Sequence, residues 1–123
     1  ADLTNADLER ANLQHAGLCC ALLTRANLTR ADLSMAYLGG AHLDSTILRG
    51  AILADANLEE CQSDHTDFQG ASLIGADFGA ASVKRASFRD ADLSGADIQD
   101  TTDFGYQSNF DNARYWGSKR GRS

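Results

Sequence analysis

The strongest constraint on the fold is a five-residue period that runs through the first hundred residues. Read in fives from the first residue, the third residue of each five is apolar from Leu3 to Leu58 and again from Phe68 to Ile98, and Ser63 is the one exception. A fixed short period of this kind is the signature of a repeat architecture. The first residue of each five is Ala with three exceptions, Thr46, Cys61 and Thr66.

A period of five fits neither regular element. On an α-helix five residues turn through about 500°, so the apolar residues would share no face. On a flat strand five is an odd number, so successive apolar residues would alternate between the two faces. A chain that turns a corner once per five residues, always in the same sense, places every third residue inside a tube and leaves room beside it for a small Ala. The sequence therefore predicts an inward-wound, all-β rod with polar residues outside.

The repeat has the form A(D/N)LXX, as in Ala6-Asp7-Leu8, Ala26-Asn27-Leu28 and Ala91-Asp92-Leu93. Over residues 1–100, without an insertion, it resembles the pentapeptide-repeat family. The resemblance implies a right-handed quadrilateral β-helix, a solenoid with four fives to a coil, so the twenty fives would form about five coils. Neighbouring coils would lie about 4.8 Å apart, which is the spacing of hydrogen-bonded strands.

We expect one domain with three parts: the β-helix (1–100), a partial last coil with an irregular aromatic C-terminal cap (101–116) and a disordered tail (117–123). Beyond Ile98 the apolar spacing changes to Phe104, Phe110 and Tyr115, and the open end of a solenoid needs a cap. Ser63 predicts a gap or a distortion in its coil, so Leu at this position should stabilise the fold. The expected core residues are Leu3, Leu8, Leu13, Leu28, Leu33, Leu58, Phe68, Phe78, Phe88, Leu93 and Ile98.

A twenty-residue coil would stack equivalent positions, so each side of the rod can be read as a face. The acidic face holds Glu59, Glu60, Asp77 and Asp97 without a basic residue, and the apolar face holds Met35, Ile52 and Ile74. We interpret these seven residues as candidate interaction surfaces. The acidic face comprises 16–20, 36–40, 56–60, 76–80 and 96–100; the apolar face comprises 11–15, 31–35, 51–55, 71–75 and 91–95. The mixed-charge face comprises 6–10, 26–30, 46–50, 66–70 and 86–90; the histidine face comprises 1–5, 21–25, 41–45, 61–65 and 81–85.

On the histidine face, His42, Asp44, Asp64 and His65 fall on adjacent coils. Two carboxylates and two imidazoles are a donor set that a divalent metal can use. The alternative is a solvated polar patch. Outward groups on a convex rod have no cleft that excludes water, and this favours the patch.

The sequence indicates a protein without catalytic activity or a cofactor. No catalytic triad or Gly-rich phosphate loop can be assembled from it, and no apolar run is long enough to span a membrane. The first hypothesis is a scaffold that presents its faces to an unknown protein partner. The second rests on the resemblance, because some family members mimic duplex DNA and protect DNA gyrase; the net charge of −6 is compatible with this.

Two other kinds of association follow from the two ends of the chain. Four of the eleven basic residues lie in 114–123, but such a short basic tail makes direct nucleic-acid binding the least favoured hypothesis. At the other end, the coil that begins at Ala1 carries no visible cap. Because open sheet edges pair with other edges, a homodimer through this N-terminal coil is predicted.

Overall fold

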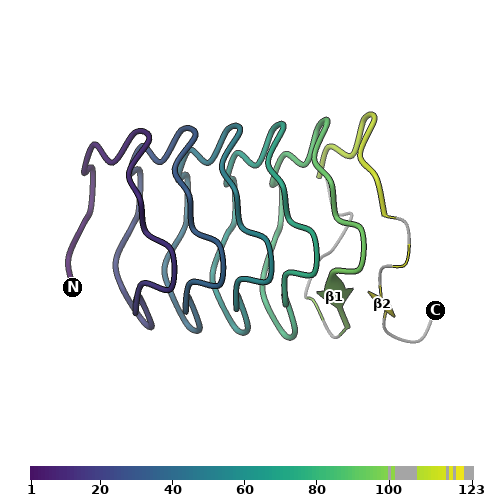
Figure 1. The fold of residues 1–123 in the computed structure, drawn as a ribbon, viewed down its shortest axis with the longest axis horizontal. Coiled ribbons are helices and arrows are strands. Elements are labelled where there is room, and N and C mark those ends of the chain that lie inside the picture. The colour runs from purple at the N-terminus through teal and green to yellow at the C-terminus, as the bar shows by residue number, and fades with distance from the viewer. Residues whose placement is uncertain (100, 102–107, 116, 118, 121–123) are drawn as a thin grey trace.

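The chain forms a solenoid whose coils stack along one axis, with residue 1 at one end and strands β1 and β2 near the other (Figure 1). The computed structural model describes residues 1–99, 101, 108–115, 117 and 119–120. The named strands are β1 (Asp97–Ile98) and β2 (Lys119–Arg120), which pair in parallel. Elsewhere in the described residues, neighbouring coils are joined by single parallel bridges.

Each coil is twenty residues long, because the bridges join second residues of fives that are twenty positions apart. Asp7 pairs with Asn27, and Asn27 pairs with Ile47. Two backbone hydrogen bonds accompany such a bridge: the Leu8 N–H donates to the Asn27 carbonyl at 2.8 Å, and the Asn27 N–H donates to the Ala6 carbonyl at 2.8 Å. The ladder along the rod therefore satisfies backbone groups that the core would otherwise leave without partners.

A turn with a positive φ ends each five and directs the chain along the next side. The Ala6 N–H donates to the Leu3 carbonyl at 3.0 Å, and the intervening Asn5 has a φ of 64°. A positive φ at the third residue of a four-residue turn is the requirement of a type II turn. Every fifth residue from Asn5 to Gly95 shares this sign of φ. None of these positions holds a β-branched residue or Phe, Tyr or Trp, which agrees with the steric cost of this region for bulky side chains.

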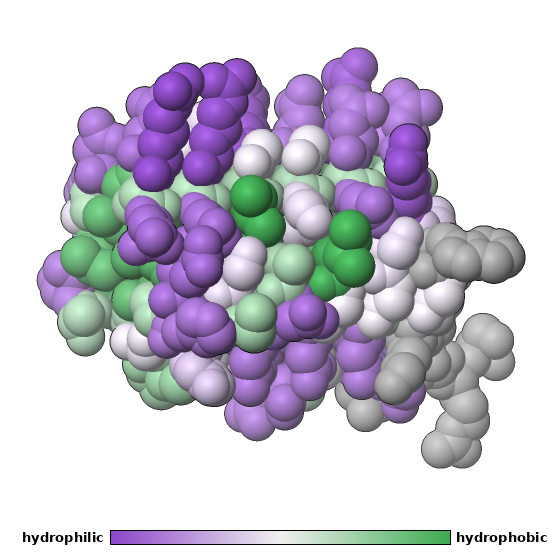
Figure 2. Space-filling model, in the orientation of Figure 1, coloured by the Kyte–Doolittle hydropathy of each residue, from purple (hydrophilic) through white to green (hydrophobic). Residues whose placement is uncertain are grey.

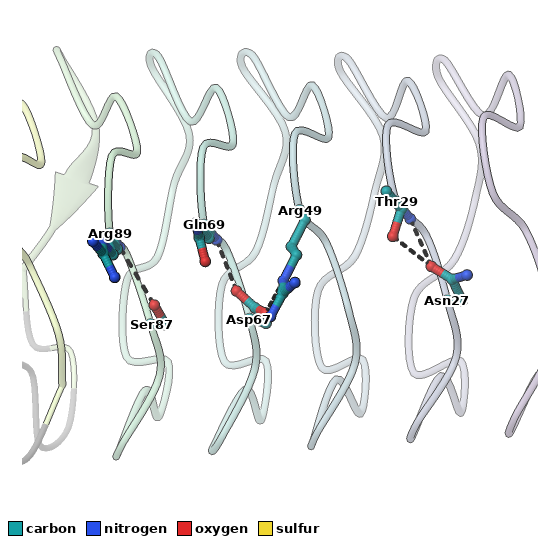
Figure 3. Close-up of polar contacts among 7 residues, drawn as sticks. All are labelled: Asn27, Thr29, Arg49, Asp67, Gln69, Ser87 and Arg89. Carbon is teal, nitrogen blue, oxygen red and sulfur yellow. Dashed lines mark hydrogen bonds and ion pairs between the residues drawn. The ribbon is translucent and has the colours of Figure 1, made fainter.

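The Asp or Asn at the second position stabilises the corner that follows it. Asn27 Oδ1 accepts hydrogen bonds from the Thr29 N–H at 3.0 Å and from the Thr29 hydroxyl at 2.6 Å, and Asp67 accepts the Gln69 N–H at 3.0 Å (Figure 3). The fourth-position N–H takes no part in the ladder, so these Asx turns supply its acceptor. The preference for Asp or Asn before Leu thus has a structural cause.

The third-position side chains fill the centre of the solenoid, and the first-position Ala residues pack beside them. From Leu28 onward, every expected core residue has an exposed fraction of 5% or less. Phe68 and Phe88 are twenty residues apart and stack with ring centroids 4.9 Å apart and planes 7° from parallel. Phe78 meets Phe68 edge-on at 5.7 Å, so the aromatic rings form one continuous cluster in this half of the rod.

Ser63 does not distort its coil. The Ser63 N–H donates to the Ser82 carbonyl at 2.8 Å, the Ser63 hydroxyl donates to the same carbonyl at 2.8 Å, and the corner at His65 has the usual positive φ of 61°. Two of the other three inward positions in this coil hold Phe68 and Phe78. The small Ser side chain therefore accompanies large rings in one layer, as close packing requires, and the expected distortion is absent at this five.

The first coil is less buried than the coils that follow. Leu3, Leu8 and Leu13 are only partly buried and pack against the core, whereas Leu23, which is equivalent to Leu3 in the next coil, is fully buried. The core assignment therefore holds only in part for these three residues. The reason is that an end layer of a solenoid has a packed neighbour on one side only.

Beyond residue 100 the ladder continues with a changed spacing. Ser87 pairs with Asn109 and Asp92 pairs with Arg114, so these partners are 22 rather than 20 residues apart. The same offset relates Asp97 to Lys119 in the pairing of β1 with β2. Lys119–Arg120, which fall within the expected disordered tail of 117–123, form β2 because the open edge of β1 offers backbone partners to them.

The predicted aromatic cap is described in part. Phe110 and Tyr115 are partly buried against the core, with ring centroids 5.9 Å apart. Phe110 stacks on Phe88 at a centroid distance of 4.9 Å, so the aromatic cluster extends into the last part of the rod. Phe104 lies outside the described residues, as does Trp116.

Candidate functional site

The predicted metal cluster consists of His42, Asp44, Asp64 and His65. Its two carboxylates occupy equivalent positions in neighbouring coils, but each is hydrogen-bonded to protein. Asp44 Oδ1 accepts the Asp64 N–H at 3.3 Å, and Asp64 Oδ1 accepts the Lys84 N–H at 3.0 Å and the Ser82 hydroxyl at 2.6 Å. Within the described residues, no group of three or more His, Cys, Asp or Glu side chains is placed to hold a metal ion. The structure thus does not assemble these four residues into a ligand set.

The positions of Asp44 and Asp64 have a local explanation. On most faces an Asp or Asn at the second position of a five accepts the N–H of the fourth residue. On the histidine face the second positions hold His42, Gln62 and Ser82. There the fourth-position Asp of one coil accepts the fourth-position N–H of the next coil instead. The cluster is therefore part of the hydrogen bonding that secures the corners.

This arrangement places two carboxylates close together. Burial raises the pKa of Asp44 above its ordinary value of 3.8, and the hydrogen bond from the Asp64 N–H opposes this shift. The negative charge of Asp64 also raises the pKa of Asp44, while His42 and His65 lower it. Asp44 therefore supplies a needed acceptor, but its charged form is disfavoured by its surroundings.

The acidic face carries a real concentration of negative charge. Glu59 and Glu60 are exposed, while Asp77 and Asp97 are partly buried and form Asx turns of their own. A hydrogen bond with Asp77 raises the pKa of Glu59, and the negative charges of Asp77, Glu60 and Asp97 raise it further. This mutual repulsion would be relieved by a positively charged partner, because unlike charges favour the ionised form.

The apolar face exposes its predicted side chains. Met35, Ile52 and Ile74 have exposed fractions of 47%, 42% and 46%. The Met35 N–H donates to the Ala54 carbonyl at 2.9 Å, and the Asp55 N–H donates to the Ile74 carbonyl at 2.8 Å. Met35 and Ile74 therefore lie on opposite sides of the same corner in the intervening coil.

The sequence interpretation missed three further exposed apolar residues. Leu22, Tyr37 and Ile47 each occupy the second position of a five, where Asp or Asn is usual, and they lie on three different faces. The replacement of Asp or Asn by an apolar residue was the signal that could have found them. Figure 2 shows hydrophobic residues as separate spots on a largely hydrophilic side, with a further group at the left end, where the first coil lies. The side seen in this view carries no broad hydrophobic surface.

The mixed-charge face combines paired and unpaired basic residues. Arg49 Nε lies 2.5 Å from Asp67 Oδ2 in an ion pair between neighbouring coils (Figure 3). Arg89 Nε lies 4.0 Å from Asp90 Oδ2. Arg30 is exposed, and within the described residues its side chain has neither a hydrogen bond nor an ion pair.

Open hollows interrupt the outer surface of the described residues, and three of them are lined as follows. They are hollows on a convex rod and do not exclude water as an enclosed catalytic cleft does. One of about 300 Å³ is lined by Thr29, Arg30, Arg49, Gly50, Gln69, Gly70 and Asp90. One of about 380 Å³ is lined by Gly70, Ala71, Ser72, Asp90, Asp92, Asn112 and Arg114, and one of about 320 Å³ on the acidic face is lined by Cys20, Gly39, Gly40, Asn57, Glu59 and Glu60.

The cysteines add no further candidate site. Cys19 and Cys20 are exposed free thiols, and Cys61 is a buried free thiol. Burial raises the pKa of the Cys61 thiol to about 12, so this side chain stays protonated and unreactive at neutral pH. In the part of the chain that the structure describes, no helix has the length and apolar character needed to cross a membrane.

Comparison with known proteins agrees with the repeat geometry. The family model for pentapeptide repeats matches in eight copies, over residues 1–43, 26–62 and 66–102. No curated protein matches the chain. Among solved structures, Rfr23 from the cyanobacterium Cyanothece 51142 shares 31% sequence identity over 82% of this chain and 60% of its own, with a TM-score of 0.46.

Two other similar structures are HetL and QnrB1. HetL, a protein involved in heterocyst differentiation regulation from Nostoc sp. strain PCC 7120, shares 29% identity over 96% of this chain and 56% of its own, with a TM-score of 0.38. Full-length QnrB1, a plasmid-mediated fluoroquinolone resistance protein, shares 15% identity over 97% of this chain and 79% of its own, with a TM-score of 0.38. The chain thus spans less than two thirds of the length of Rfr23 and of HetL. Because the family match covers most of residues 1–102 and each repeat forms one side of a coil, this chain belongs to the pentapeptide-repeat family.

Proposed function

We propose that this protein is a non-catalytic scaffold whose faces bind protein partners. The observation that carries the proposal is the twenty-residue ladder, which holds a different set of side chains on each face of one continuous rod. Carboxylates gather on one face, exposed Met and Ile side chains on another, and paired charges on a third. Solenoids use such extended, regular surfaces for recognition.

The finer architecture belongs to the same proposal. We infer a right-handed, four-sided β-helix of about five coils over residues 1–100, followed by a partial coil that the aromatic residues of 101–116 cap. The support is the twenty-residue spacing of the bridges, with one corner per five, together with the stacking of Phe110 on Phe88. A rod of this kind needs no ligand to hold its faces in place.

The scaffold proposal is tested by capturing partners with variants that change one face at a time. The immobilised chain is incubated with extract from its source cell, and retained proteins are identified by mass spectrometry. Glu59→Lys with Glu60→Lys alters the acidic face, and Ile52→Lys with Ile74→Lys alters the apolar face. We expect a partner to be lost with one pair and retained with the other. Failure of the wild-type chain to retain any protein above a denatured control would contradict the scaffold proposal.

A DNA-mimicking protein that binds DNA gyrase or topoisomerase is the alternative function, and the acidic face is the observation in its favour. The distribution of charge opposes it, because the mixed-charge face pairs Arg49 with Asp67 and brings Arg89 near Asp90. Duplex DNA presents phosphates on all sides. We expect no effect in a gyrase supercoiling assay, and inhibition or protection at micromolar protein would favour the alternative.

For the 123-residue chain as a separate polypeptide, we further propose a homodimer through the first coil. The support is the partial exposure of Leu3, Leu8 and Leu13, and two copies meeting head to head would close by two-fold symmetry. Sedimentation equilibrium at tens of micromolar should give twice the chain mass. A short charged extension before Ala1 should abolish the pairing, and a single-chain mass for the unextended chain would refute it.

A further inference from the structure

The corner between the mixed-charge face and the apolar face contains a notch that the repeat pattern does not require. The fifth-position residues at this corner are Arg10, Arg30, Gly50, Gly70, Asp90 and, after the change of spacing, Asn112. All six have a positive φ. Four of them carry a long or polar side chain, so the backbone does not demand glycine at Gly50 and Gly70.

The two glycines leave a hollow that runs across several coils. The hollow of about 300 Å³ and the hollow of about 380 Å³ share Gly70 and Asp90, so they adjoin along the same edge of the rod. A Cβ atom added at Gly70 would have its nearest neighbour at 3.9 Å, the Gly50 nitrogen. The space above Gly70 is thus open, and a longer side chain there would enter it.

The ends of the notch carry opposite charges. At the end nearer residue 1, Arg30 extends over Gly50, since a Cβ at Gly50 would lie 3.4 Å from Arg30 Cγ. Arg30 is exposed and its guanidinium has no partner among the described residues, whereas Arg49, which lines the same hollow, is paired with Asp67. At the other end Asp90 and Asp92 line the adjoining hollow together with Arg114, so two carboxylates there face one basic side chain. The side chain of Asp90 is exposed and lies 4.0 Å from Arg89 Nε in an ion pair at the edge of contact distance.

We propose that this notch binds an extended peptide segment of a partner protein, with an acidic residue at Arg30 and a basic residue at Asp90. The backbone positions of Arg30 and Asp90 are three coils apart, or about 14 Å at the strand spacing. An extended chain rises about 3.3 Å per residue, so the acidic and basic residues of the peptide should be four positions apart. Glycine at the floor lets the peptide backbone approach the coil closely. This inference rests on the proposed scaffold function and names one of its binding sites.

The test uses two-dimensional NMR of the ¹⁵N-labelled full chain, titrated with the acetylated and amidated peptide Glu-Ser-Thr-Ser-Lys. We expect shifts of the amide signals of Gly50 and Gly70 with saturation in the millimolar range. The peptides Glu-Ser-Thr-Ser-Glu and Lys-Ser-Thr-Ser-Lys should bind at least about tenfold more weakly, because each brings one like charge to an end of the notch. No shift of these signals with the mixed-charge peptide, or equal shifts with all three peptides, would overturn the proposal.

Two variants and a matched control complete the test. Gly70→Asn should abolish binding by filling the notch. Gly95→Asn makes the same change at the next corner, where φ is +70° against +68° at Gly70 and the nearest neighbour of an added Cβ is again at 3.9 Å. Arg30→Glu should lose the mixed-charge peptide and bind Lys-Ser-Thr-Ser-Lys in its place. The backbone should tolerate this change, because Glu60 occupies the same fifth position of its repeat with a φ of 58°. Equal binding of the mixed-charge peptide by Gly70→Asn and Gly95→Asn would overturn the proposal that the notch is the binding site. If the Gly70→Asn variant captures a partner protein as well as the wild-type chain does, the notch proposal fails but the scaffold proposal stands.

Discussion

Phe110 stacks on Phe88 with ring centroids 4.9 Å apart and planes 7° from parallel, the same geometry with which Phe88 stacks on Phe68. The first pair is separated by 22 residues and the second by 20. The core therefore continues without a break across a segment in which the repeat has changed. Ring stacking and the backbone ladder therefore both carry on into the last part of the rod at the new spacing.

This stacking predicts a clear loss of stability for Phe110→Ala. Phe110 is partly buried, so the loss should be about 2 kcal/mol, below the 3–5 kcal/mol expected for truncating a fully buried Phe. Phe88→Ala should reach that upper range, because Phe88 has rings on both sides. Urea denaturation followed by circular dichroism measures both variants. An unchanged midpoint for Phe110→Ala would show that the last coil does not contribute to the cooperative core.

Ser63→Leu should destabilise the protein, in contrast to what the repeat pattern alone predicts. Ser63 is buried in the same coil as Phe68 and Phe78, and a larger side chain would overpack this layer at a cost of about 1–3 kcal/mol. Phe78→Leu in the same chain should recover part of the loss, and a coupling of at least about 0.5 kcal/mol between the two sites is expected. Thermal unfolding of the two single variants and the double variant completes the cycle. A higher melting temperature for Ser63→Leu alone would show that the layer contains unfilled space.

Replacing glycine by alanine should have opposite effects on stability at Gly17 and at Gly95. A Cβ at Gly17 would meet no atom within 4 Å, and Gly17 does not have a positive φ, so Gly17→Ala should stabilise the protein by about 0.4–1 kcal/mol. Gly95 has a φ of +70°, so Gly95→Ala should destabilise it by about 1 kcal/mol. Chemical denaturation of both variants under one condition measures the difference. Equal effects would mean that the corners can change their backbone conformation freely.

The pKa values of Asp44 and Asp32 are shifted in opposite directions, so the two residues should contribute to stability with opposite pH dependence. The pKa of Asp44 is raised, chiefly by burial, so the folded state binds its proton more tightly than the unfolded state does, and stability falls as the pH rises through the raised pKa. Asp44→Asn keeps an acceptor for the Asp64 N–H and should raise the melting temperature at pH 7. The gain should vanish when the pH falls below the ordinary Asp value of 3.8.

The pKa of Asp32 is lowered, first by hydrogen bonds from the Ser34 hydroxyl and N–H. Its contribution to stability is therefore present above the ordinary value of 3.8 and is lost as the pH falls through the lowered pKa. Asp32→Asn should give a lower melting temperature than the wild-type chain at pH 7, with the difference shrinking in acid. Thermal unfolding between pH 2.5 and pH 7 compares both variants, and parallel curves for the two would contradict these assignments.

Several features of the outer surface could be read from the sequence because they depend only on position within the five. The exposure of Met35, Ile52 and Ile74 and the gathering of Glu59 and Glu60 on one side follow once equivalent residues stack at a fixed interval. The interval itself came from the family resemblance. The positive φ of the fifth residue was also present in the sequence, as an absence of β-branched residues at that position, but this signal is recognised only when the turn is known.

The sequence by itself determined the inward Leu and Ala positions, since a period of five has one arrangement in which all of them can be buried. It could not determine features that depend on contacts between neighbouring coils. Asp64 holds the Lys84 N–H because Ser82 replaces the usual Asx residue, and Arg30 lies over the notch because Gly50 follows it in the next coil. The offset that brings Phe110 onto Phe88 was likewise decided by tertiary packing. Short repeats encode the path of the backbone locally, whereas these contacts join residues that are about twenty positions apart and exist only after the coils have stacked.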